Sequence, residues 1–170
     1  MKGTKSPLFL YFILRFKMDQ TKVTDLVNEA LALNESLYLI DLSISENNKI
    51  KVTIDGDKGV PLSECIRVSR NVEHNFDREE EDFSLEVSTP DISNPLKVKR
   101  QYIKNLNRIL KVKTSEQDME GVLVEADEDK IVLNWKAREP KPIGKGKVTV
   151  QKTATIPYKD IKEAKVKIVF

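Results

Sequence analysis

Few residues of this 170-residue chain have the types and spacing that catalysis requires. His74 is the sole histidine and Cys65 the sole cysteine, and no nucleophile, base and orienting partner are grouped around either. We place His74 on a helix surface. Cys65 lies near Leu62, Ile66 and Val72, which is typical of a buried thiol, because reactive thiolates need a polar and accessible site. We therefore do not expect an enzyme, and catalysis through Cys65 is the weaker alternative.

Two acidic stretches could attract a cation. The segment DGDKG, residues 55–59, begins like a calcium loop but lacks the later ligands and the closing glutamate. The run DREEED, residues 77–82, is typical of a solvated acidic loop. The sequence contains no phosphate-binding loop, dinucleotide fingerprint or zinc spacing. We expect no metal, no cofactor and no small-molecule substrate.

Basic residues give a stronger signal, because clustered lysine and arginine attract phosphates in a salt-sensitive way. The segment 97–113 has no acidic residue, and the segment 136–147 has Glu139 alone. The predicted nucleic-acid-binding surface consists of Lys97, Lys99, Arg100, Lys104, Arg108, Lys111, Lys113, Lys136, Arg138, Lys141, Lys145 and Lys147. Tyr102 and Trp135 are predicted to stack on unpaired bases. The alternative is that these lysines protect strand edges and that Trp135 fills the core.

The charges are distributed unevenly along the chain. Residues 1–96 contain 11 Lys and Arg against 17 Asp and Glu, whereas residues 97–170 contain 18 against 10. This asymmetry indicates two modules with different roles. A single cysteine excludes an intramolecular disulfide and favours a reducing compartment, so we expect a cytoplasmic protein.

Residues 1–17 resemble a signal peptide only superficially. The apolar run 8–16 is too short to cross a membrane, and Arg15 and Lys17 occupy positions where a cleavage site needs small residues. We interpret residues 1–17 as an extension before a start at Met18, with a membrane-surface anchor as the alternative. We expect no membrane partner.

The first module, residues 18–92, shows an α-β-β-α-β pattern. A helix is predicted over 21–33, capped by Thr21 or Thr24. Strands over 37–45 and 49–55 form a predicted hairpin. The residues expected on one face of the first strand are Tyr38, Ile40, Leu42 and Ile44.

The next predicted helix begins at Pro61, and Ser63 is expected to cap it. The residues expected on its apolar face are Leu62, Cys65, Ile66, Ser69, Val72 and Phe76. A third strand follows over 83–87. This pattern predicts a layered α+β module, an α/β sandwich.

A rigid, bent connector is predicted where the charge balance changes. Pro90 removes a backbone donor and disfavours helical angles at the preceding residue. Asp91 and Asn94 are predicted to adopt left-handed backbone angles, which few residues other than glycine tolerate. Pro95 then fixes the direction of the chain. We place the module boundary between residues 92 and 93.

The second module, residues 93–170, is predicted to be a small β-barrel. A short helical piece precedes strand candidates over 109–114, 121–126, 130–135, 148–156 and 164–169. Five short strands in so short a segment favour a barrel over a sandwich. The segment 136–147, with two prolines and two glycines, is predicted to be a flexible loop. The segment YKDIKEA, residues 158–164, resembles the helical turn of SH3-like barrels.

Three passages resemble the bacterial ribosome maturation factor RimP family. The first is similar to a strand, turn and helix of that family at Asp55, Gly59, Val60, Cys65, Ser69 and Arg70. The second matches a Leu-Glu-Val-Ser-x-Pro…Pro-Leu signature at Leu85, Glu86, Val87, Ser88, Pro90, Pro95 and Leu96. The third is looser, a basic ending with Gly-x-Leu at 121–123. The resemblance covers residues 18–170.

The resemblance implies an α+β domain followed by an SH3-like (Sm-like) small β-barrel. It implies a non-enzymatic, monomeric factor that binds the immature small (30S) ribosomal subunit through its rRNA, with a small-subunit ribosomal protein at the C-terminal barrel. The alternative is a general RNA-binding module without ribosome specificity. Asp91 replaces the usual glycine of the family, and Ser93 and Asn94 replace an acidic–arginine pair. The missing arginine puts any partner contact of that side chain in doubt.

Overall fold

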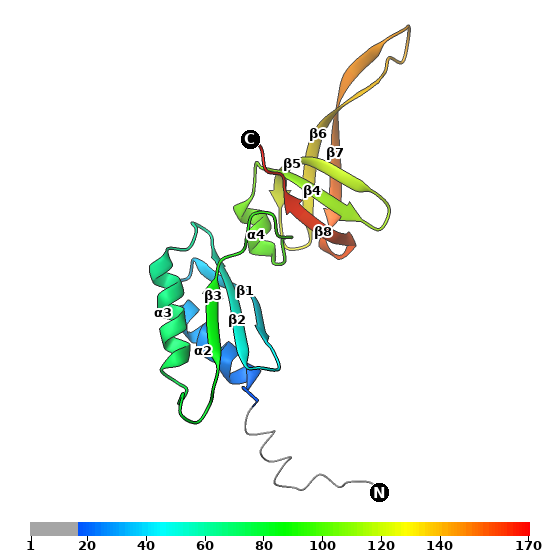
Figure 1. Cartoon of the computed structure of the whole chain (residues 1–170). Coiled ribbons are helices and arrows are strands. Elements are labelled where there is room, and N and C mark those ends of the chain that lie inside the picture. The colour runs from blue at the N-terminus through cyan, green and yellow to red at the C-terminus, as the bar shows by residue number, and fades with distance from the viewer. Residues whose placement is uncertain (1–16) are drawn as a thin grey trace, which may run out of the picture. The chain divides into compact units, whose positions relative to one another are not determined.

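The computed structural model describes residues 17–170, which divide into two compact units between Pro90 and Asp91 (Figure 1). This division lies two residues before the boundary expected from the sequence. The predicted N-terminal extension lies outside the described residues, apart from Lys17. Within the described chain, no helix is long and apolar enough to cross a membrane.

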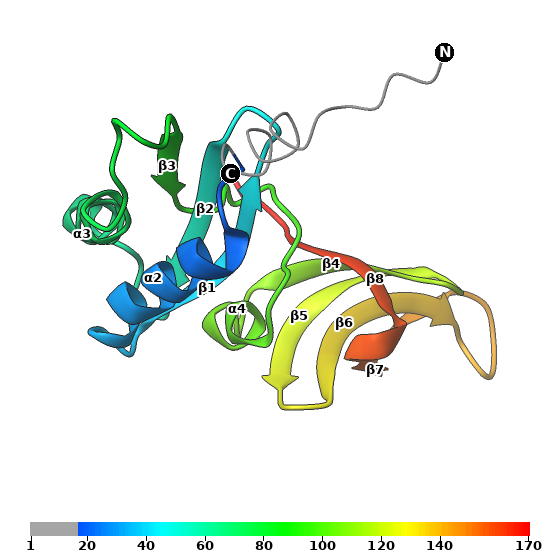
Figure 2. The same cartoon turned by 90° about the horizontal axis from the view of Figure 1, so that it is seen from below.

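The described part of the first unit has the predicted α-β-β-α-β order. Its elements are α2 (Gln20–Ala32), β1 (Leu37–Ile44), β2 (Lys49–Gly56), α3 (Leu62–Glu73) and β3 (Ser84–Ser88). The sheet order is β1-β2-β3, with β1 and β2 antiparallel and β2 and β3 parallel. Both helices cover one face of this mixed sheet (Figure 2). On β2 the alternation holds from Lys49 to Ile54, where Ile50, Val52 and Ile54 are buried beneath the helices.

The predicted core face of β1 is wrong in its first half. A register shift between Leu39 and Asp41 marks a β-bulge. Since a bulge adds one residue to the strand, the side-chain alternation changes phase there. Leu37 and Leu39 therefore contact the same core cluster as Leu42 and Ile44, in place of Tyr38 and Ile40.

The helix faces also differ from the prediction. The residues of α3 in the core are Cys65, Val68 and Val72, whereas Leu62 is 75% exposed and Ile66 is 41% exposed. Ser63 does not cap α3, since Pro61 takes the N-cap position without a side-chain hydrogen bond.

Helix α2 begins one residue earlier than predicted, and its cap also differs. Asp19, and neither threonine, is the N-cap. Its carboxylate accepts hydrogen bonds from the backbone N–H groups of Thr21 and Lys22.

Asp91 shapes the connector by hydrogen bonding and not by a left-handed backbone. Within residues 17–170, the non-glycine residues with positive φ are Asn48 and Asn107, so the angles predicted for Asp91 and Asn94 are wrong. Asp91 Oδ1 accepts from the backbone N–H of Ser93 at 2.8 Å and from its hydroxyl at 2.6 Å. The backbone N–H of Asn94 donates to the Asp91 carbonyl at 2.9 Å. These contacts form an Asx-type turn, which needs a short polar side chain but no unusual φ.

The second unit, all of which is described, is an antiparallel sheet preceded by a short helix. Its elements are α4 (Lys99–Lys104), β4 (Ile109–Thr114), β5 (Asp118–Ala126), β6 (Lys130–Pro140), β7 (Lys147–Pro157), the 3-10 turn η1 (Tyr158–Asp160) and β8 (Ile161–Val166). The strand order is β7-β6-β5-β4-β8. In this unit β7 and β8 do not pair, so the hydrogen-bonded sheet stays open and the expected closed barrel is not formed by strand pairing.

The predicted loop over 136–147 is wrong for half of its length. Strands β6 and β7 pair without interruption. The ladder begins where Lys130 lies opposite Pro157 and ends where Pro140 lies opposite Lys147. Only residues 141–146 form the turn. The segment is a long β-hairpin that extends from the sheet of the second unit (Figure 1).

Candidate nucleic-acid interface

The outer half of the β6–β7 hairpin, residues 135–152, is a two-stranded arm. The last residue of β6 that pairs with β5 is Asn134, opposite Val122. Beyond it, β6 pairs with β7 alone in the second unit. Six strand residues at about 3.4 Å each give the arm a reach of about 20 Å before its turn.

Cross-strand pairing sorts the side chains of the arm onto two faces. Residues directly opposite each other in a ladder point to the same side. The arm's basic face therefore contains Lys136 with Gln151, Arg138 with Thr149, and Pro140 with Lys147. Its other face continues the buried face of Leu133 and contains Trp135, Ala137, Glu139, Val148, Val150 and Lys152.

The turn of the arm keeps two further cations at its end. Lys141 and Lys145 are both exposed. The backbone N–H of Lys141 donates to the Gly146 carbonyl and closes the turn at 3.1 Å. Gly144 and Gly146 have φ values of +89° and +108°, which glycine adopts without steric cost.

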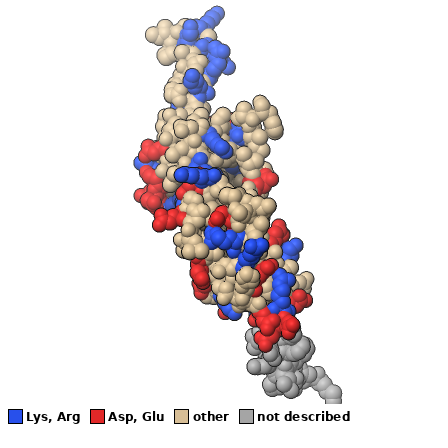
Figure 3. Space-filling view, turned by 90° about the vertical axis from the view of Figure 1, so that its left-hand side faces the viewer, with Lys and Arg blue, Asp and Glu red and all other residues tan. Residues whose placement is uncertain are grey.

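Positive charge on the arm's basic face has no acidic neighbour on that face. Lys136, Arg138 and Lys147 are exposed, and the described residues form no ion pair with them. The acid of the arm, Glu139, lies on the opposite face and forms an ion pair with Lys152. The side of the arm visible in Figure 3 accordingly shows lysine and arginine at its end.

The basic segment around β4 is different, because acids from neighbouring strands lie beside its lysines. Lys113 and Lys165 both contact Glu163, at 3.6 and 3.8 Å. Lys111 lies opposite Glu120, whose carboxylate also accepts a 2.6 Å hydrogen bond from Lys167. That hydrogen bond lowers the pKa of Glu120. We call this mixed-charge surface the β4 outer face.

The basic residues in and near α4 differ in their contacts and in their exposure to solvent. Lys99 is 3.6 Å from Glu128 and lies 5.5 Å from the centre of the Tyr158 ring. Arg108 Nη1 donates to the Asn105 side chain at 3.4 Å. Lys97 and Lys104 are exposed, and Arg100 is half-buried. None of these basic residues belongs to the β6–β7 ladder that forms the arm.

The two predicted stacking residues are unequal. Tyr102 is 5% exposed, and its ring packs edge-to-face on Tyr158 with 5.2 Å between ring centres. Burial raises the pKa of Tyr102 to about 12. This tyrosine is part of the core and offers no free ring face. Trp135 packs partly against the same core at the base of the arm.

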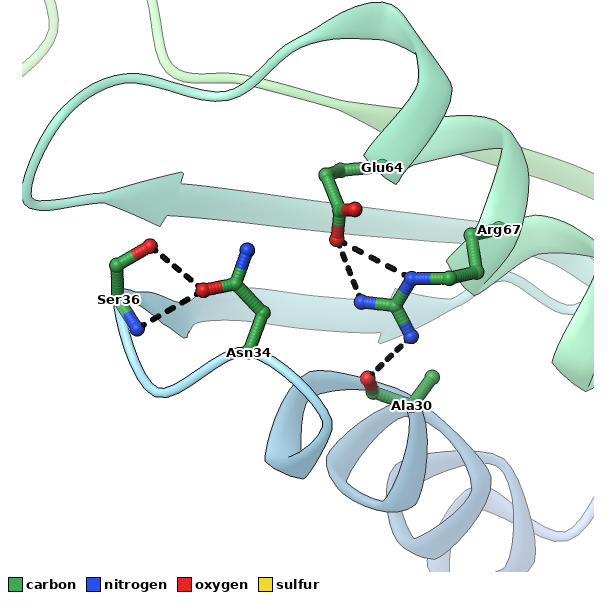
Figure 4. Close-up of polar contacts among 5 residues, drawn as sticks. All are labelled: Ala30, Asn34, Ser36, Glu64 and Arg67. Carbon is green, nitrogen blue, oxygen red and sulfur yellow. Dashed lines mark hydrogen bonds and ion pairs between the residues drawn. The ribbon is translucent and has the colours of Figure 1, made fainter.

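A polar cluster of the first unit joins helices α2 and α3 (Figure 4). Arg67 Nη1 donates to the Ala30 carbonyl of α2 at 2.6 Å, while its other nitrogens donate to Glu64 at 2.5 and 3.2 Å. The hydrogen bond from Arg67 lowers the pKa of Glu64. Asn34 accepts from the backbone N–H and hydroxyl of Ser36. Because the side chain of Arg67 is hydrogen-bonded both to Glu64 of α3 and to the Ala30 carbonyl of α2, we interpret this cluster as a contact that holds the two helices together.

Two observations bear on the catalytic and metal alternatives. Burial raises the pKa of the Cys65 thiol, which disfavours the thiolate. No group of three or more possible metal ligands occurs in residues 17–170. The turn DGDKG depends on glycine geometry. Gly59 has φ +85°, and a Cβ on Gly56 would lie 2.7 Å from the Gly59 carbonyl oxygen.

The surface predicted from the sequence did not include the polar residues on the arm's basic face. Thr149 and Gln151 share that face with the predicted cations. The alternation of Val148 and Val150 with these polar residues was a signal for a strand. This alternation did not show that β7 already begins at Lys147, the last residue of the expected loop.

Comparisons with known proteins cover most of the chain. Residues 26–93 match a family model described as the RimP N-terminal domain. Over 153 residues the chain is 56% identical to a ribosome maturation factor RimP from Christiangramia forsetii, covering 90% of this chain and 100% of the relative. The chain belongs to the RimP family. A RimP from Flavobacterium psychrophilum is 50% identical, with 88% and 97% covered, and one from Porphyromonas gingivalis is 33% identical, with 86% and 97% covered.

The RimP signature positions have clear structural places. The Leu-Glu-Val-Ser segment forms β3, which pairs in parallel with β2. Pro90 ends the first unit and Leu96 packs against the core of the second. The backbone N–H of Leu96 also donates to the Ala164 carbonyl of β8 at 2.8 Å. The signature therefore anchors both ends of the connector.

Proposed function

We propose that this chain is a ribosome assembly factor that binds the immature small (30S) subunit and promotes its maturation without catalysis. The observation that carries the proposal is the 56% identity over the full length of a relative named ribosome maturation factor RimP. The match spans the whole of that relative. The proposal places the protein in the cytoplasm as a monomer.

The proposed architecture is an α+β module over 18–92 and an SH3-like (Sm-like) module over 93–170. Support for the second comes from its strand order, in which β8 pairs with β4 and a 3-10 turn directly precedes β8. All five strands also contribute side chains to one core cluster. An SH3-like module of this kind would curve its sheet around that core without pairing β7 to β8.

The proposed mechanism is a population shift. Binding would stabilise an arrangement of RNA and protein that the immature subunit seldom adopts alone. Exposed basic residues of the second unit that have no carboxylate beside them would contact rRNA, and a small-subunit ribosomal protein would contact the same unit. The buried Cys65 thiol fits a factor that works by binding.

A general RNA-binding module is the alternative, and the exposed cations of the arm would serve it equally well. Gradient sedimentation of tagged protein with cell lysate separates the two. An assembly factor should be enriched on free small subunits and absent from translating ribosomes. Binding to any RNA of similar length, without enrichment on small subunits, would favour the alternative.

A further inference from the structure

We infer that the arm, residues 135–152, is a one-sided RNA-binding ribbon that contacts backbone phosphates through Lys136, Arg138 and Lys147. This inference rests on the proposed function, since it names the surface through which the factor would contact RNA. It separates the arm from the other basic residues of the chain, which the sequence alone grouped with it.

The first support is the geometry of the arm. Because β5 stops pairing with β6 at Asn134, both edges of the ribbon beyond that point lack a further strand in the second unit. A narrow two-stranded ribbon can lie along the wide, shallow minor groove of an RNA helix, where 2′-hydroxyls and phosphates are accessible. Residues that alternate along one strand are about 7 Å apart, so the cations form a row along one side of the ribbon.

The second support is the sorting of charge between the faces. The arm's basic face presents Lys136, Arg138 and Lys147, together with the hydrogen-bonding side chains of Thr149 and Gln151. Lysine supplies point charges, and arginine can hold a phosphate with two parallel hydrogen bonds. The acid of the arm is on the other face and is already paired with Lys152. A phosphate approaching the basic face therefore meets donors and no carboxylate of the arm.

The third support is the contrast with the β4 outer face. Its lysines are close in sequence to many other cations, yet Glu163 lies within 4 Å of both Lys113 and Lys165. A phosphate there would compete with a carboxylate that is already in place. Exposed ion pairs are weak, but they reduce the net field of a surface. The β4 outer face thus provides a control set of equal positive charge.

RNA is favoured over an acidic protein or a membrane by the composition of the basic face. Its sole apolar member in the ladder is Pro140, so it offers little surface for burial against a protein or lipid. Phosphate binding needs little apolar contact and depends on charge and hydrogen bonds.

The test compares two triple variants of the full chain with equal change in charge. One is Lys136→Gln, Arg138→Gln and Lys147→Gln in the arm, and the other is Lys111→Gln, Lys113→Gln and Lys165→Gln on the β4 outer face. Binding of a fluorescently labelled RNA stem-loop is measured over a salt series. We expect the arm variant to lose affinity roughly tenfold or more and its log–log salt slope to fall by about 2 to 3. The β4 variant should stay within about twofold of the wild type, because Glu163 lies within 4 Å of Lys113 and Lys165, and Glu120 lies opposite Lys111.

Four outcomes decide the inference. Equal loss in both variants, or a wild-type chain that does not bind the stem-loop, overturns it. An arm variant that keeps stem-loop binding but no longer binds purified small subunits also overturns it, because the arm would then contact protein. If the arm dependence holds while the wild type fails to sediment with small subunits, the arm inference stands and the proposed function fails. Urea unfolding followed by fluorescence of Trp135, the sole tryptophan, confirms that both variants fold.

Discussion

Pro140 lies opposite Lys147 at the last step of the β6–β7 ladder. This pairing turns a segment with the composition of a loop into an ordered arm. Proline lacks a backbone donor and is tolerated mainly on edge strands, and the end of a two-stranded arm has only edges. The same pairing places Lys147 on the face of Arg138 and Lys136, although nine and eleven residues separate them in the chain.

We predict that Val68, and not Leu62, stabilises helix α3 against the sheet. Val68 is fully buried, whereas Leu62 is 75% exposed. Val68→Ala should lower the free energy of unfolding by about 1.6 kcal/mol or more, at about 0.8 kcal/mol for each methyl group lost. Leu62→Ala should change it by less than about 0.5 kcal/mol. Urea denaturation followed by far-UV circular dichroism measures both, and a reversed order would contradict the assigned helix face.

The stability of the first unit should depend on pH through Glu64. Because Arg67 donates hydrogen bonds to this carboxylate, its pKa is lowered from 4.5 in the folded state. A lowered folded pKa means a stabilising contribution that is present above the unfolded pKa and is lost as pH falls through the folded pKa. The gap in unfolding free energy between wild type and Glu64→Gln should therefore be larger at neutral pH than at about pH 3.

Arg67→Met provides the matched control for that measurement. It removes the partner of Glu64 and the bond to the Ala30 carbonyl, and should cost about 1 to 2 kcal/mol at neutral pH. In this background Glu64→Gln should have little effect at either pH. A pH-dependent gap that persists without Arg67 would show that another group lowers the pKa of Glu64.

The Cys65 thiol should react slowly in the native protein. Burial both blocks access and raises its pKa, so little thiolate is available near neutral pH. Labelling with a maleimide should accelerate strongly in urea. A Ser115→Cys variant supplies an exposed thiol in the same chain for comparison. Equal labelling rates at both positions in buffer would revive the catalytic interpretation of Cys65.

The order of helices and strands could be predicted from the sequence, because period-2 and helical patterns are local properties. The predicted strand over 109–114 coincides with β4, and the hairpin of β1 and β2 is confirmed. The bulge near Leu39 could not be predicted, since it depends on the register with β2. The prediction of the buried face of α3 was wrong for a related reason. Leu62 and Val68 are both apolar, and only the packing against the sheet distinguishes them.

The candidate binding surface was predicted only as a list of cations. Sequence runs show which residues are basic but not which acids lie beside them in space. Glu120 and Glu163 reach the lysines of β4 from neighbouring strands, and Glu163 lies 50 residues from Lys113 in the chain. Tyr102 was grouped with exposed aromatics because a short helix of six residues gives no clear amphipathic pattern.

The central claim, that this chain binds immature small subunits as an assembly factor, is tested most directly by its distribution in a sucrose gradient. A tagged full-length chain is expressed at native level, and each fraction is assayed for the tag. The account predicts a peak with free small subunits and only background signal with translating ribosomes. A tag that remains at the top of the gradient, or that spreads over all RNA-containing fractions in proportion to their RNA, would contradict it.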